Sequence, residues 1–343
     1  MQTVMDTTMM TEDNTSKEWL SLLDDDALLR IRGLRVEYRT ERAKASAVNG
    51  LDFIIRKGES IGLVGETGAG KTTVALSILN LLPRDIGFIT EGKIEFNGDD
   101  VQKMKPRQLK DMRGGKVSMI FQNPLTALNP VFTVGEQISL LLRIHQKLSR
   151  TQAFNRSREL LEMVGIEGYR AKDFPHQFSG GMRQRVGIAA ALACNPMLLI
   201  ADEPTTALDV TIQAQILELM RKLQSNYDTS LLMITHNLGI IAELCQQVAV
   251  MYAGRIIEYG SVQSVFTSPQ HPYTSGLLGS LPSLDEDVER LVAIPGIIAS
   301  AQNLPSGCAF HPRCENCVEK CKTEQPLMTK ISDGHFVECF ARE

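Results

Sequence analysis

Short apolar runs, bounded by glycine, polar or charged residues, recur along the chain and predict its core. Four of them, at residues 61–64, 118–121, 197–201 and 231–235, have the length and the continuous apolar character of strands buried on both faces. Segments of helical character separate these runs. An alternation of buried strands with helices predicts an α/β fold whose core sheet is mostly parallel.

Two further patterns surround this core. Residues 28–38, 51–55 and 93–96 have the composition of strands, and the Asn-Gly pair that follows the last of them is a strong hairpin signal. These segments predict an antiparallel β layer beside the core sheet. Helical periodicity dominates from about residue 125 to residue 177 and predicts a helical subdomain.

The length and net charge of the chain limit the classes of protein to which it can belong. Its 343 residues exceed what one ordinary core needs, so we expect a main domain with an appendage. The net charge of −4 offers no basic field for nucleic acid. No run approaches the roughly 18 apolar residues that cross a bilayer, since the longest helical candidate is residues 186–194. Residues 1–26 lack the regions of a signal peptide and predict a flexible tail.

A glycine-rich loop follows the first core run. It comprises Gly65, Glu66, Thr67, Gly68, Ala69, Gly70, Lys71, Thr72 and Thr73, and helical character begins after it. Glycines let the backbone turn its N–H groups onto phosphate oxygens, and the start of a helix adds a positive dipole. In such a loop Lys71 reaches the outer phosphates and the Thr72 hydroxyl holds Mg²⁺. This strand, loop and helix predict a nucleotide site.

Polar residues also end three other core runs. Asp202 and Glu203 end one of them, where Asp202 would orient the Mg²⁺ shell and Glu203 would polarise the attacking water. The alternative is an exposed acidic turn before Pro204. His236 and Gln122 follow the other two runs. In isolation such residues are more often a structural histidine and a polar loop residue.

A second glycine pair opens a later helix, in the segment Phe178-Ser179-Gly180-Gly181-Met182-Arg183-Gln184-Arg185. Together with the phosphate loop and the acidic pair, this segment resembles the nucleotide-binding subunits of ABC transporters, over nearly all of residues 27–343. By that resemblance residues 65–73 are the Walker A loop, Gln122 is the Q-loop sensor of Mg²⁺ and water, residues 178–182 are the signature, Asp202 and Glu203 end the Walker B strand, residues 206–209 are the D-loop, and His236 is the switch histidine that contacts the γ-phosphate.

The resemblance also assigns the contacts to the nucleotide. Ser179, Gly180 and Gly181 would supply γ-phosphate contacts to nucleotide held by the opposite protomer, so it implies a dimer with an identical or a sister chain. Phe178 stands where Leu is usual and Met182 where many cassettes have Gln, and neither change touches these contacts.

Two more residues receive roles in this way. Tyr38 matches the aromatic residue that stacks on adenine, the alternative being a tyrosine that packs across strands. Asp209 ends the D-loop and is counted with the nucleotide-binding residues.

Two segments resemble one branch of the family. Residues 122–130 are similar to the Q-loop region of peptide and nickel importers, where a coupling helix of the membrane subunit docks; the alternative is an ordinary surface loop. Residues 268–278 are similar to the start of the C-terminal extension of oligopeptide, dipeptide and nickel importer ATPases. The expected organisation is a tail at 1–26, an ABC ATPase domain at 27–266 with its helical subdomain at about 125–180, and an extension at 267–343.

The extension gathers five of the seven cysteines: Cys308, Cys314, Cys317, Cys321 and Cys339. Reduced thiols at this density favour a metal site over disulfides, with an iron–sulfur cluster or zinc as the occupant and free cysteines as the remaining alternative. The resemblance assigns Cys308, Cys314, Cys321 and Cys339 as the ligands of a [4Fe-4S] cluster. Cys317 departs from the family pattern, where a small residue is commoner, and leaves the choice of ligands open.

Four other residues bear on this site. His311 and His335 are alternative ligands that are more simply read as loop residues. Cys194 and Cys245 fall in apolar segments expected to be helical, and we expect them to pack in the core.

The resemblance implies the ATP-binding and ATP-hydrolysing subunit of an importer for di- or oligopeptides, with ATP and Mg²⁺ between two such chains. Its partners would be two integral membrane permease subunits and, indirectly, an extracytoplasmic substrate-binding protein, and no nucleic acid. The chain would lie peripherally on the cytoplasmic face of the membrane. Nickel or glutathione import is a close alternative. A soluble cassette acting on ribosomes or DNA is a distant one, because such proteins usually join two cassettes in one chain.

Overall fold

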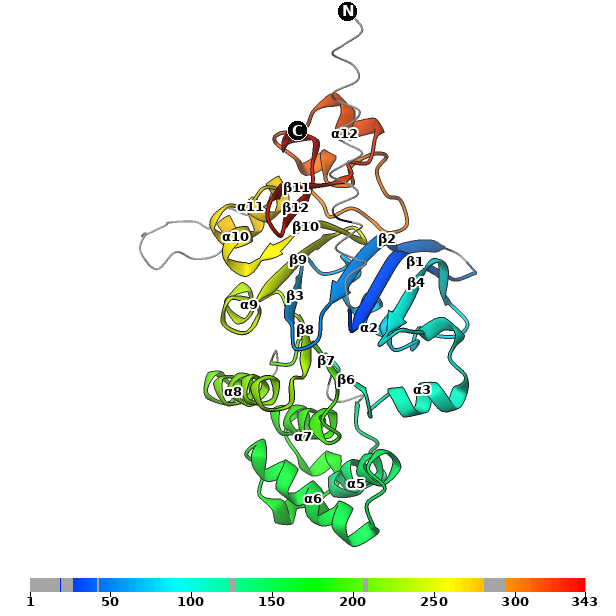
Figure 1. Cartoon of the computed structure of the whole chain (residues 1–343), viewed down its shortest axis with the longest axis vertical. Coiled ribbons are helices and arrows are strands. Elements are labelled where there is room, and N and C mark those ends of the chain that lie inside the picture. Colours follow the sequence, from blue (N-terminus) through cyan, green and yellow to red (C-terminus); the bar gives the residue numbers. More distant parts are fainter. Residues whose placement is uncertain are drawn as a thin grey trace, which may run out of the picture. The chain divides into compact units, whose positions relative to one another are not determined.

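The antiparallel layer predicted near the N-terminus is present. The computed structural model describes residues 19, 27–41, 43–123, 127–205, 209–280 and 294–342. Its chain divides into two units, the first made of residues up to 56, 61–102 and 236 to the C-terminus, and the second of 57–60 and 103–235 (Figure 1).

In the first unit, four strands form an antiparallel sheet in the order β2-β1-β4-β5. They are β1 (Leu29–Arg39), β2 (Lys44–Ile55), β4 (Gly87–Phe96) and β5 (Asp99–Asp100). Asn97 and Gly98 have φ angles of 50° and 85°, which is the left-handed backbone that a tight hairpin between β4 and β5 requires. The layer predicted from sequence is therefore confirmed, although β2 and β4 begin earlier than expected.

A second sheet of the first unit carries the phosphate loop. Its strands run in the order β11-β12-β10-β9-β3 and are β3 (Ser60–Val64), β9 (Gln247–Tyr252), β10 (Arg255–Ser261), β11 (Met328–Ser332) and β12 (His335–Glu338). β3 pairs with β9 in parallel, whereas the β9–β10, β10–β12 and β11–β12 pairs are antiparallel. The C-terminal extension thus adds two antiparallel strands to one edge of this sheet.

Five α-helices belong to the described part of the first unit: α2 (Lys71–Ile78), α9 (Leu238–Leu244), α10 (Val262–Thr267), α11 (Pro272–Gly279) and α12 (Glu319–Thr323). Short 3₁₀ turns in this unit are η4 (His311–Arg313) and η5 (Phe340–Arg342), and η1 (Val101–Lys103) spans the passage of the chain from the first unit to the second. Glycine packing explains one close approach, because a Cβ on Gly62 of β3 would collide with Ile241 of α9 at 2.6 Å.

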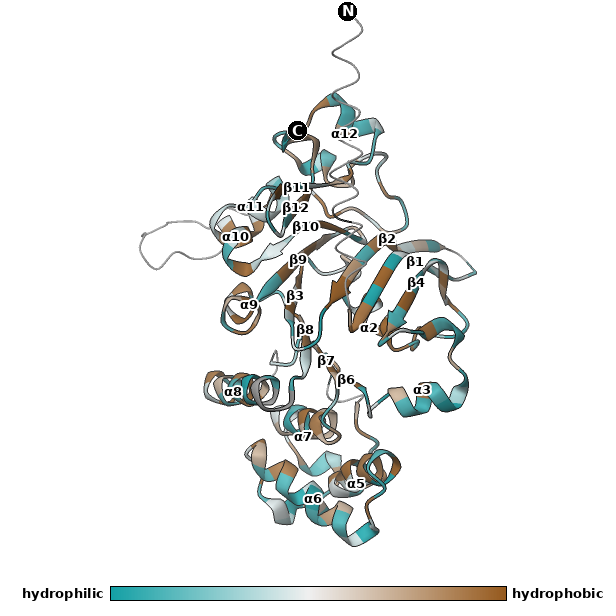
Figure 2. Ribbon diagram, in the orientation of Figure 1, coloured by the Kyte–Doolittle hydropathy of each residue, from teal (hydrophilic) through white to brown (hydrophobic). Residues whose placement is uncertain are grey.

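The second unit has three parallel strands in the order β8-β7-β6. They are β6 (Val117–Ile120), β7 (Leu198–Asp202) and β8 (Ser230–Ile234), and every residue of β7 and β8 is buried. Three of the predicted core runs therefore form adjacent parallel strands. Figure 2 shows these strands in the brown of hydrophobic residues.

The helices of the second unit are α3 (Pro106–Met112), α5 (Val134–His145), α6 (Arg150–Met163), α7 (Gly180–Leu192) and α8 (Val210–Tyr227), with 3₁₀ turns η2 (Gly168–Lys172) and η3 (Pro175–Gln177). A capping box starts α5, in which Thr133 accepts from the Glu136 N–H and Glu136 accepts from the Thr133 N–H. The predicted helical subdomain is confirmed as separate helices. The helix expected at 186–194 is α7, which ends at Leu192.

Two findings bear on membranes and on the N-terminus. Within the described ranges, no helix combines the length and the apolar character needed to span a bilayer. Trp19 is 4 % exposed and packs edge-on to Tyr259 at 5.3 Å between ring centroids, with Phe336 also at 5.3 Å. At this residue the expected flexible tail is packed against β10 and β12, and the rest of residues 1–26 lies outside the described residues.

Candidate functional site

The phosphate loop depends on glycine at two positions. Gly65 and Gly70 have φ angles of 150° and 104°, a conformation that side chains disfavour. A Cβ on Gly65 would collide with the carbonyl oxygen of Met251, and one on Gly70 with that of Ala47. The loop therefore passes directly against the backbone of β9 and β2 before α2 begins at Lys71. This close approach fixes where the N–H groups at the start of α2 point.

Lys71 is held by the loop that precedes it. Its Nζ donates to the carbonyl oxygens of Gly65 at 2.7 Å and of Glu66 at 3.0 Å, and the residue is only 8 % exposed. A buried ammonium beside the N-terminus of a helix of 8 residues is a strong site for an anion. The contact between Lys71 and the outer phosphates stays a prediction.

Tyr38 lies close to this loop. Its hydroxyl is 3.2 Å from Oγ1 of Thr73 in α2, and its ring is half-buried at the end of β1. The contact places the tyrosine at the phosphate loop rather than within the β layer alone. Stacking of Tyr38 on adenine stays a prediction.

Gln122 and Glu203 meet in the second unit. The Gln122 Nε2 donates to Oε2 of Glu203 at 3.1 Å, although the two residues are 81 positions apart. The parallel register explains this, because Ile120 of β6 lies opposite Ala201 of β7, and the carboxyl ends of both strands reach the same edge. Asp202, at the end of β7, is 2 % exposed.

Glu203 has a strained backbone. Its φ of 47° is left-handed, which is uncommon for a residue with a side chain and costs on the order of 1–3 kcal/mol. The Glu203 N–H donates to the Ile234 carbonyl at 2.8 Å, so β8 holds the turn in place. Backbone strain of this kind concentrates at functional sites.

The signature segment starts α7. Ser179 is the N-cap and its Oγ accepts from the Met182 N–H at 3.3 Å, so Gly180 and Gly181 form the first turn. Ser179 and Gly180 are exposed. Phe178 is buried, and the Arg170 guanidinium lies 4.3 Å from its ring centroid. Phenylalanine thus serves as the hydrophobic anchor at a position where leucine is usual.

Arg170 is a structural residue of the signature that no sequence pattern indicated. It donates to Asp173 Oδ2 at 2.8 Å, to the Gln177 carbonyl at 3.2 Å and to the Met182 sulfur at 3.5 Å. These bonds hold the turn that leads into α7. Its position two turns before the signature gives no periodic or motif signal.

Gln184 connects α7 to the turn after Glu203. Its Nε2 donates to the Pro204 carbonyl at 3.0 Å, inside the second unit. Asp209 caps α8 by accepting from the Ile212 N–H at 2.9 Å, which is a structural role for this D-loop residue. Residues 206–208 of the D-loop and 124–126 of the Q-loop region lie outside the described residues.

The structure therefore groups the expected nucleotide residues in two sets. Lys71, Thr72 and the rest of the phosphate loop lie in the first unit with His236, whereas Gln122, Asp202, Glu203 and the signature lie in the second. His236 is the second residue after β8. The role of His236 as a switch stays a prediction.

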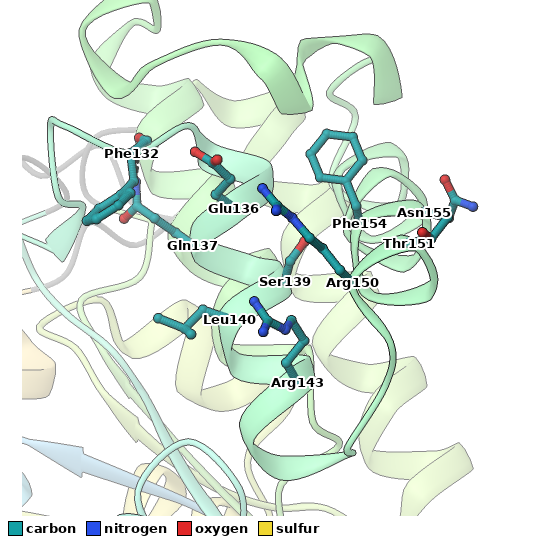
Figure 3. A pocket seen from close by; sticks show the side chains of 10 residues that line it. All are labelled: Phe132, Glu136, Gln137, Ser139, Leu140, Arg143, Arg150, Thr151, Phe154 and Asn155. Carbon is teal, nitrogen blue, oxygen red and sulfur yellow. Dashed lines mark hydrogen bonds between the residues drawn. The ribbon is translucent and has the colours of Figure 1, made fainter.

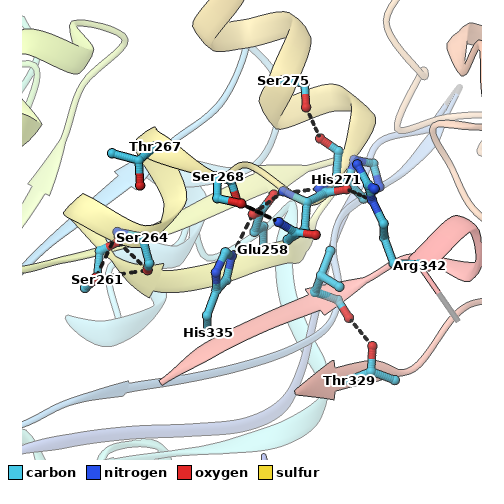
Figure 4. A network of polar contacts seen from close by, with 12 residues as sticks. Glu258, Ser261, Ser264, Thr267, Ser268, His271, Ser275, Thr329, His335 and Arg342 are labelled. Atoms are coloured by element: carbon cyan, nitrogen blue, oxygen red, sulfur yellow. Dashed lines mark hydrogen bonds and ion pairs between the residues drawn. The ribbon is translucent and has the colours of Figure 1, made fainter. Parts of the chain in front are cut away.

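A buried carboxylate joins the extension to β10 (Figure 4). Glu258 is fully buried and accepts from the N–H groups of Gln270 at 2.7 Å and His271 at 2.8 Å, and its Oε1 lies 2.8 Å from the His335 Nε2. The His271 Nδ1 in turn accepts from the Tyr273 N–H at 3.0 Å and caps α11. His335 is thus a buried residue of β12, and its expected place in a loop is wrong.

All seven cysteines lie in the described residues and each is free. Cys308 donates its N–H to the Cys321 carbonyl at 2.9 Å, and burial raises the pKa of the Cys308 thiol to about 12, with smaller contributions from Cys321 and Cys339. The thiols expected as ligands thus belong to one folded region. Among the described residues, however, no three cysteine, histidine or acidic side chains are arranged to hold a metal ion.

His311 is a turn residue, as expected, whereas the two cysteines expected inside helices lie just beyond helix ends. The Nδ1 of His311 lies 3.0 Å from the Cys308 carbonyl oxygen, which is a local turn contact. Cys194 lies just past α7 and Cys245 directly after α9, so neither is inside a helix. Burial raises the pKa of Cys194 to about 11 and that of Cys245 to about 12, as befits neutral packing residues.

Three features of this chain define an ABC-type P-loop ATPase. They are the buried lysine that ends the phosphate loop, the glutamate with a strained backbone that follows a parallel strand, and the helix that begins with a serine cap and two glycines. Comparison with known proteins agrees. A protein-family model for "ABC transporter" matches residues 48–206, and one for "Oligopeptide/dipeptide transporter, C-terminal region" matches residues 257–321.

Relatives of known name match over almost their whole length. The oligopeptide transport ATP-binding protein AppD of Bacillus subtilis is 47% identical over 92% of this chain and 97% of its own. The dipeptide transport ATP-binding protein DppD of the same organism is 45% identical over 93% of this chain and 96% of its own. The chain belongs to the family of ABC transporter ATP-binding subunits that carry the oligopeptide/dipeptide transporter C-terminal region, whose members hydrolyse ATP to drive transport.

A solved structure shares the cassette fold. The dimeric structure of the ATP-binding cassette MJ0796, in a post-hydrolysis state bound to ADP and Pi, superposes with a TM-score of 0.63 at 27% identity. The match covers 68% of this chain and 98% of that one.

Proposed function

We propose that this ATPase powers the uptake of di- or oligopeptides as a peripheral subunit on the cytoplasmic face of the membrane. The observation that carries the proposal is the extension, because its Pro272–Gly279 helix and its two strands are built into the unit that holds the phosphate loop. Relatives named for oligopeptide and dipeptide transport share this region. Import of nickel or glutathione is the nearest alternative.

The residues divide the work of hydrolysis. Lys71 and the N–H groups at the start of α2 would bind the outer phosphates of ATP. The hydroxyl of Thr72, the carboxylate of Asp202 and the amide oxygen of Gln122 are the hard oxygen donors that Mg²⁺ prefers, and the ion would neutralise charge on the phosphates. Glu203, kept in place by Gln122, would accept a proton from the attacking water.

A dimer would complete the site. Ser179 and Gly180 are exposed at the start of a helix of 13 residues, where their N–H groups and the helix dipole favour a phosphate. The related cassette MJ0796 is dimeric with ADP and Pi bound. We infer that these residues reach nucleotide held by the partner chain, which is either an identical or a sister subunit.

A groove between α5 and α6 is suited to a membrane partner (Figure 3). The cavity has a volume of about 510 Å³ and is lined by Phe132, Glu136, Gln137, Ser139, Leu140, Arg143, Arg150, Thr151, Phe154 and Asn155. Leu140 is 53 % exposed, and Phe132 is exposed as well. Apolar walls with two arginines fit an amphipathic segment that carries an acidic residue, and we assign it to a cytoplasmic helix of the permease subunit.

The cysteines of the extension would hold a [4Fe-4S] cluster, with zinc as the alternative. Four thiols from Cys308, Cys314, Cys321 and Cys339 suit either group in number and kind, although the described residues show no such side chains arranged around one metal ion. Anaerobic purification should give brown protein with iron and sulfide. Cys339→Ala should lose the colour and Cys317→Ala should keep it, whereas colourless protein with stoichiometric zinc would overturn the assignment.

Uptake in the host tests the function directly. The chain is deleted, and uptake of labelled di-, tri- and pentapeptides is measured beside nickel, with wild type or Glu203→Gln restored. Peptide uptake that is lost and then regained only with wild type supports the proposal. Loss of nickel uptake alone selects the metal importer. Isolation of the chain on ribosomes instead of with integral membrane subunits would contradict transport altogether.

A further inference from the structure

The extension contacts the phosphate loop at Glu66. Arg313, the last residue of η4, donates from one terminal nitrogen to Oε2 of Glu66 at 2.7 Å and from the other to Oε1 at 3.0 Å. The Arg313 side chain is 3 % exposed. A bidentate, largely buried pair of this kind is among the strongest and most directional polar contacts in proteins.

The remaining donors of Arg313 are also bonded. Its Nε donates to the Pro295 carbonyl at 2.9 Å, and its terminal nitrogens reach the Tyr252 hydroxyl and the Ile294 carbonyl, each at 3.4 Å. The rings of Tyr252 and Phe310 each lie 5.8 Å from the guanidinium carbon. All five N–H groups therefore have acceptors, and the guanidinium has one orientation, toward Glu66.

A second residue of the extension holds the Glu66 backbone. The Glu66 N–H donates to the Tyr273 hydroxyl oxygen at 2.8 Å. Tyr273 is fully buried in α11 and packs on Tyr252 at 4.8 Å between ring centroids. Glu66 is thus fixed at its side chain and at its backbone by residues that follow it by more than two hundred positions.

Glu66 in turn supports the lysine. Its carbonyl oxygen accepts from the Lys71 Nζ at 3.0 Å, next to the Gly65 carbonyl at 2.7 Å. The Glu66 carboxylate faces Arg313, and its N–H faces Tyr273, so this residue acts on the nucleotide through Lys71. A continuous path of hydrogen bonds runs from the extension to the ammonium that binds phosphate.

We propose that Arg313 and Tyr273 are positioning residues of the ATP site, which hold the phosphate loop in its nucleotide-binding form through Glu66. The alternative is a purely structural role, in which the pair of Arg313 and Glu66 only attaches the extension to the ATPase unit. The two readings differ in what they predict for nucleotide affinity. Neither depends on which solute is imported, so failure of this inference leaves the peptide proposal standing.

The full-length chain is assayed for ATP affinity and for steady-state hydrolysis. Arg313→Ala and Glu66→Gln should each raise the Kd and the KM for ATP by roughly tenfold, the loss expected for a charge-assisted hydrogen-bonded pair. The kcat should change by about twofold or less, because the groups at Glu203 are untouched. The double variant should be no worse than either single variant, since both remove the same contact.

Two matched variants separate positioning from stability. Arg313→Lys keeps the charge and should restore part of the affinity. Arg30→Ala removes another half-buried arginine pair, with Glu95 at 3.1 Å in the antiparallel layer, and should leave KM unchanged. A lower melting temperature of Arg313→Ala with wild-type Kd and KM would overturn the proposal.

Tyr273→Phe provides an independent test, because it deletes one hydroxyl from a buried ring and keeps the packing. It should raise the Kd for ATP by several-fold. If Arg313→Ala fails to fold, the Kd of Tyr273→Phe decides whether the proposal holds. An unchanged Kd in Tyr273→Phe would show that the Glu66 N–H needs no partner and would remove Tyr273 from the assignment.

Discussion

At the scale of single residues, Glu203 combines backbone strain with a defined hydrogen-bond partner. Its backbone is left-handed, with a φ of 47°, and the Gln122 Nε2 donates to its Oε2 at 3.1 Å. A shift of Gln122 would therefore change the hydrogen bonding of this carboxylate. This coupling links the element that leads into the helical subdomain to the group that would activate water.

Glu203→Gln should leave ATP bound while hydrolysis stops. The amide cannot accept the proton of the attacking water, so turnover should fall by about a hundredfold or more. The variant should accumulate as an ATP-bound dimer in size-exclusion chromatography. Lys71→Ala is the contrasting control and should weaken nucleotide binding itself. Wild-type turnover in Glu203→Gln would remove this residue from its role.

The buried His271 should make the free energy of unfolding depend on pH in the acidic range. Burial lowers the pKa of His271 to about 4, below its ordinary value of 6.5. Between these two pH values the unfolded chain binds more protons than the folded chain, so stability falls as pH decreases from about 6.5 toward 4 and gains nothing above that window. The slope should approach 1 kcal/mol per pH unit.

His271→Asn tests this expectation. Asparagine retains an acceptor for the Tyr273 N–H that His271 caps at 3.0 Å, but it does not titrate. Denaturant unfolding of both proteins at several pH values should show a shallower slope for the variant. Equal slopes would mean that other groups produce the acid sensitivity.

At the scale of elements, the α5–α6 groove leads to a prediction about permease binding that can be tested separately from ATP hydrolysis. Leu140→Glu places an acidic group where we expect an acidic partner segment, so co-purification with the permease subunit should be lost. The ATPase activity of the isolated chain should stay within about twofold, because none of the residues assigned to hydrolysis lines the groove. Met163→Glu, at an exposed apolar position outside the groove lining, should keep the complex and serves as the control.

The elements that sequence predicted best are those with a local signal. Continuous apolar runs located β3, β6, β7 and β8 to within a residue or two, and the Asn-Gly pair located the β4–β5 hairpin. The glycine spacing was likewise sufficient to predict the phosphate loop, because the backbone conformation of this loop requires glycine.

The contacts that sequence missed are long-range. β11 and β12 are short, and their place beside β10 depends on Glu258 and His335, which are 77 positions apart. The partner of Glu66 depends equally on a distant contact, that with Arg313. No periodic pattern marks a side chain whose partner is set by the fold, and the carboxylate of Glu66 was therefore counted only with the nucleotide.

At the scale of the whole molecule, Trp19 brings one residue from near the N-terminus into contact with β10 and with β12 of the extension. It is the single tryptophan of the chain, and it packs between Tyr259 and Phe336. Its fluorescence should be blue-shifted and shielded from iodide in the native protein. Trp19→Ala should lower the free energy of unfolding by about 3 kcal/mol or more, the usual cost of emptying a buried aromatic site. Emission typical of a solvent-exposed indole would contradict this packing.

The bond between Arg313 and Glu66 spans 247 positions. During translation the phosphate loop emerges from the ribosome early, long before the arginine that fixes its glutamate has been added. By our inference the loop gains its full support only once the extension has been made and has folded back onto it. A chain cut short by a premature stop or by proteolysis in the extension would then bind ATP weakly. Such an incomplete subunit would therefore consume little ATP.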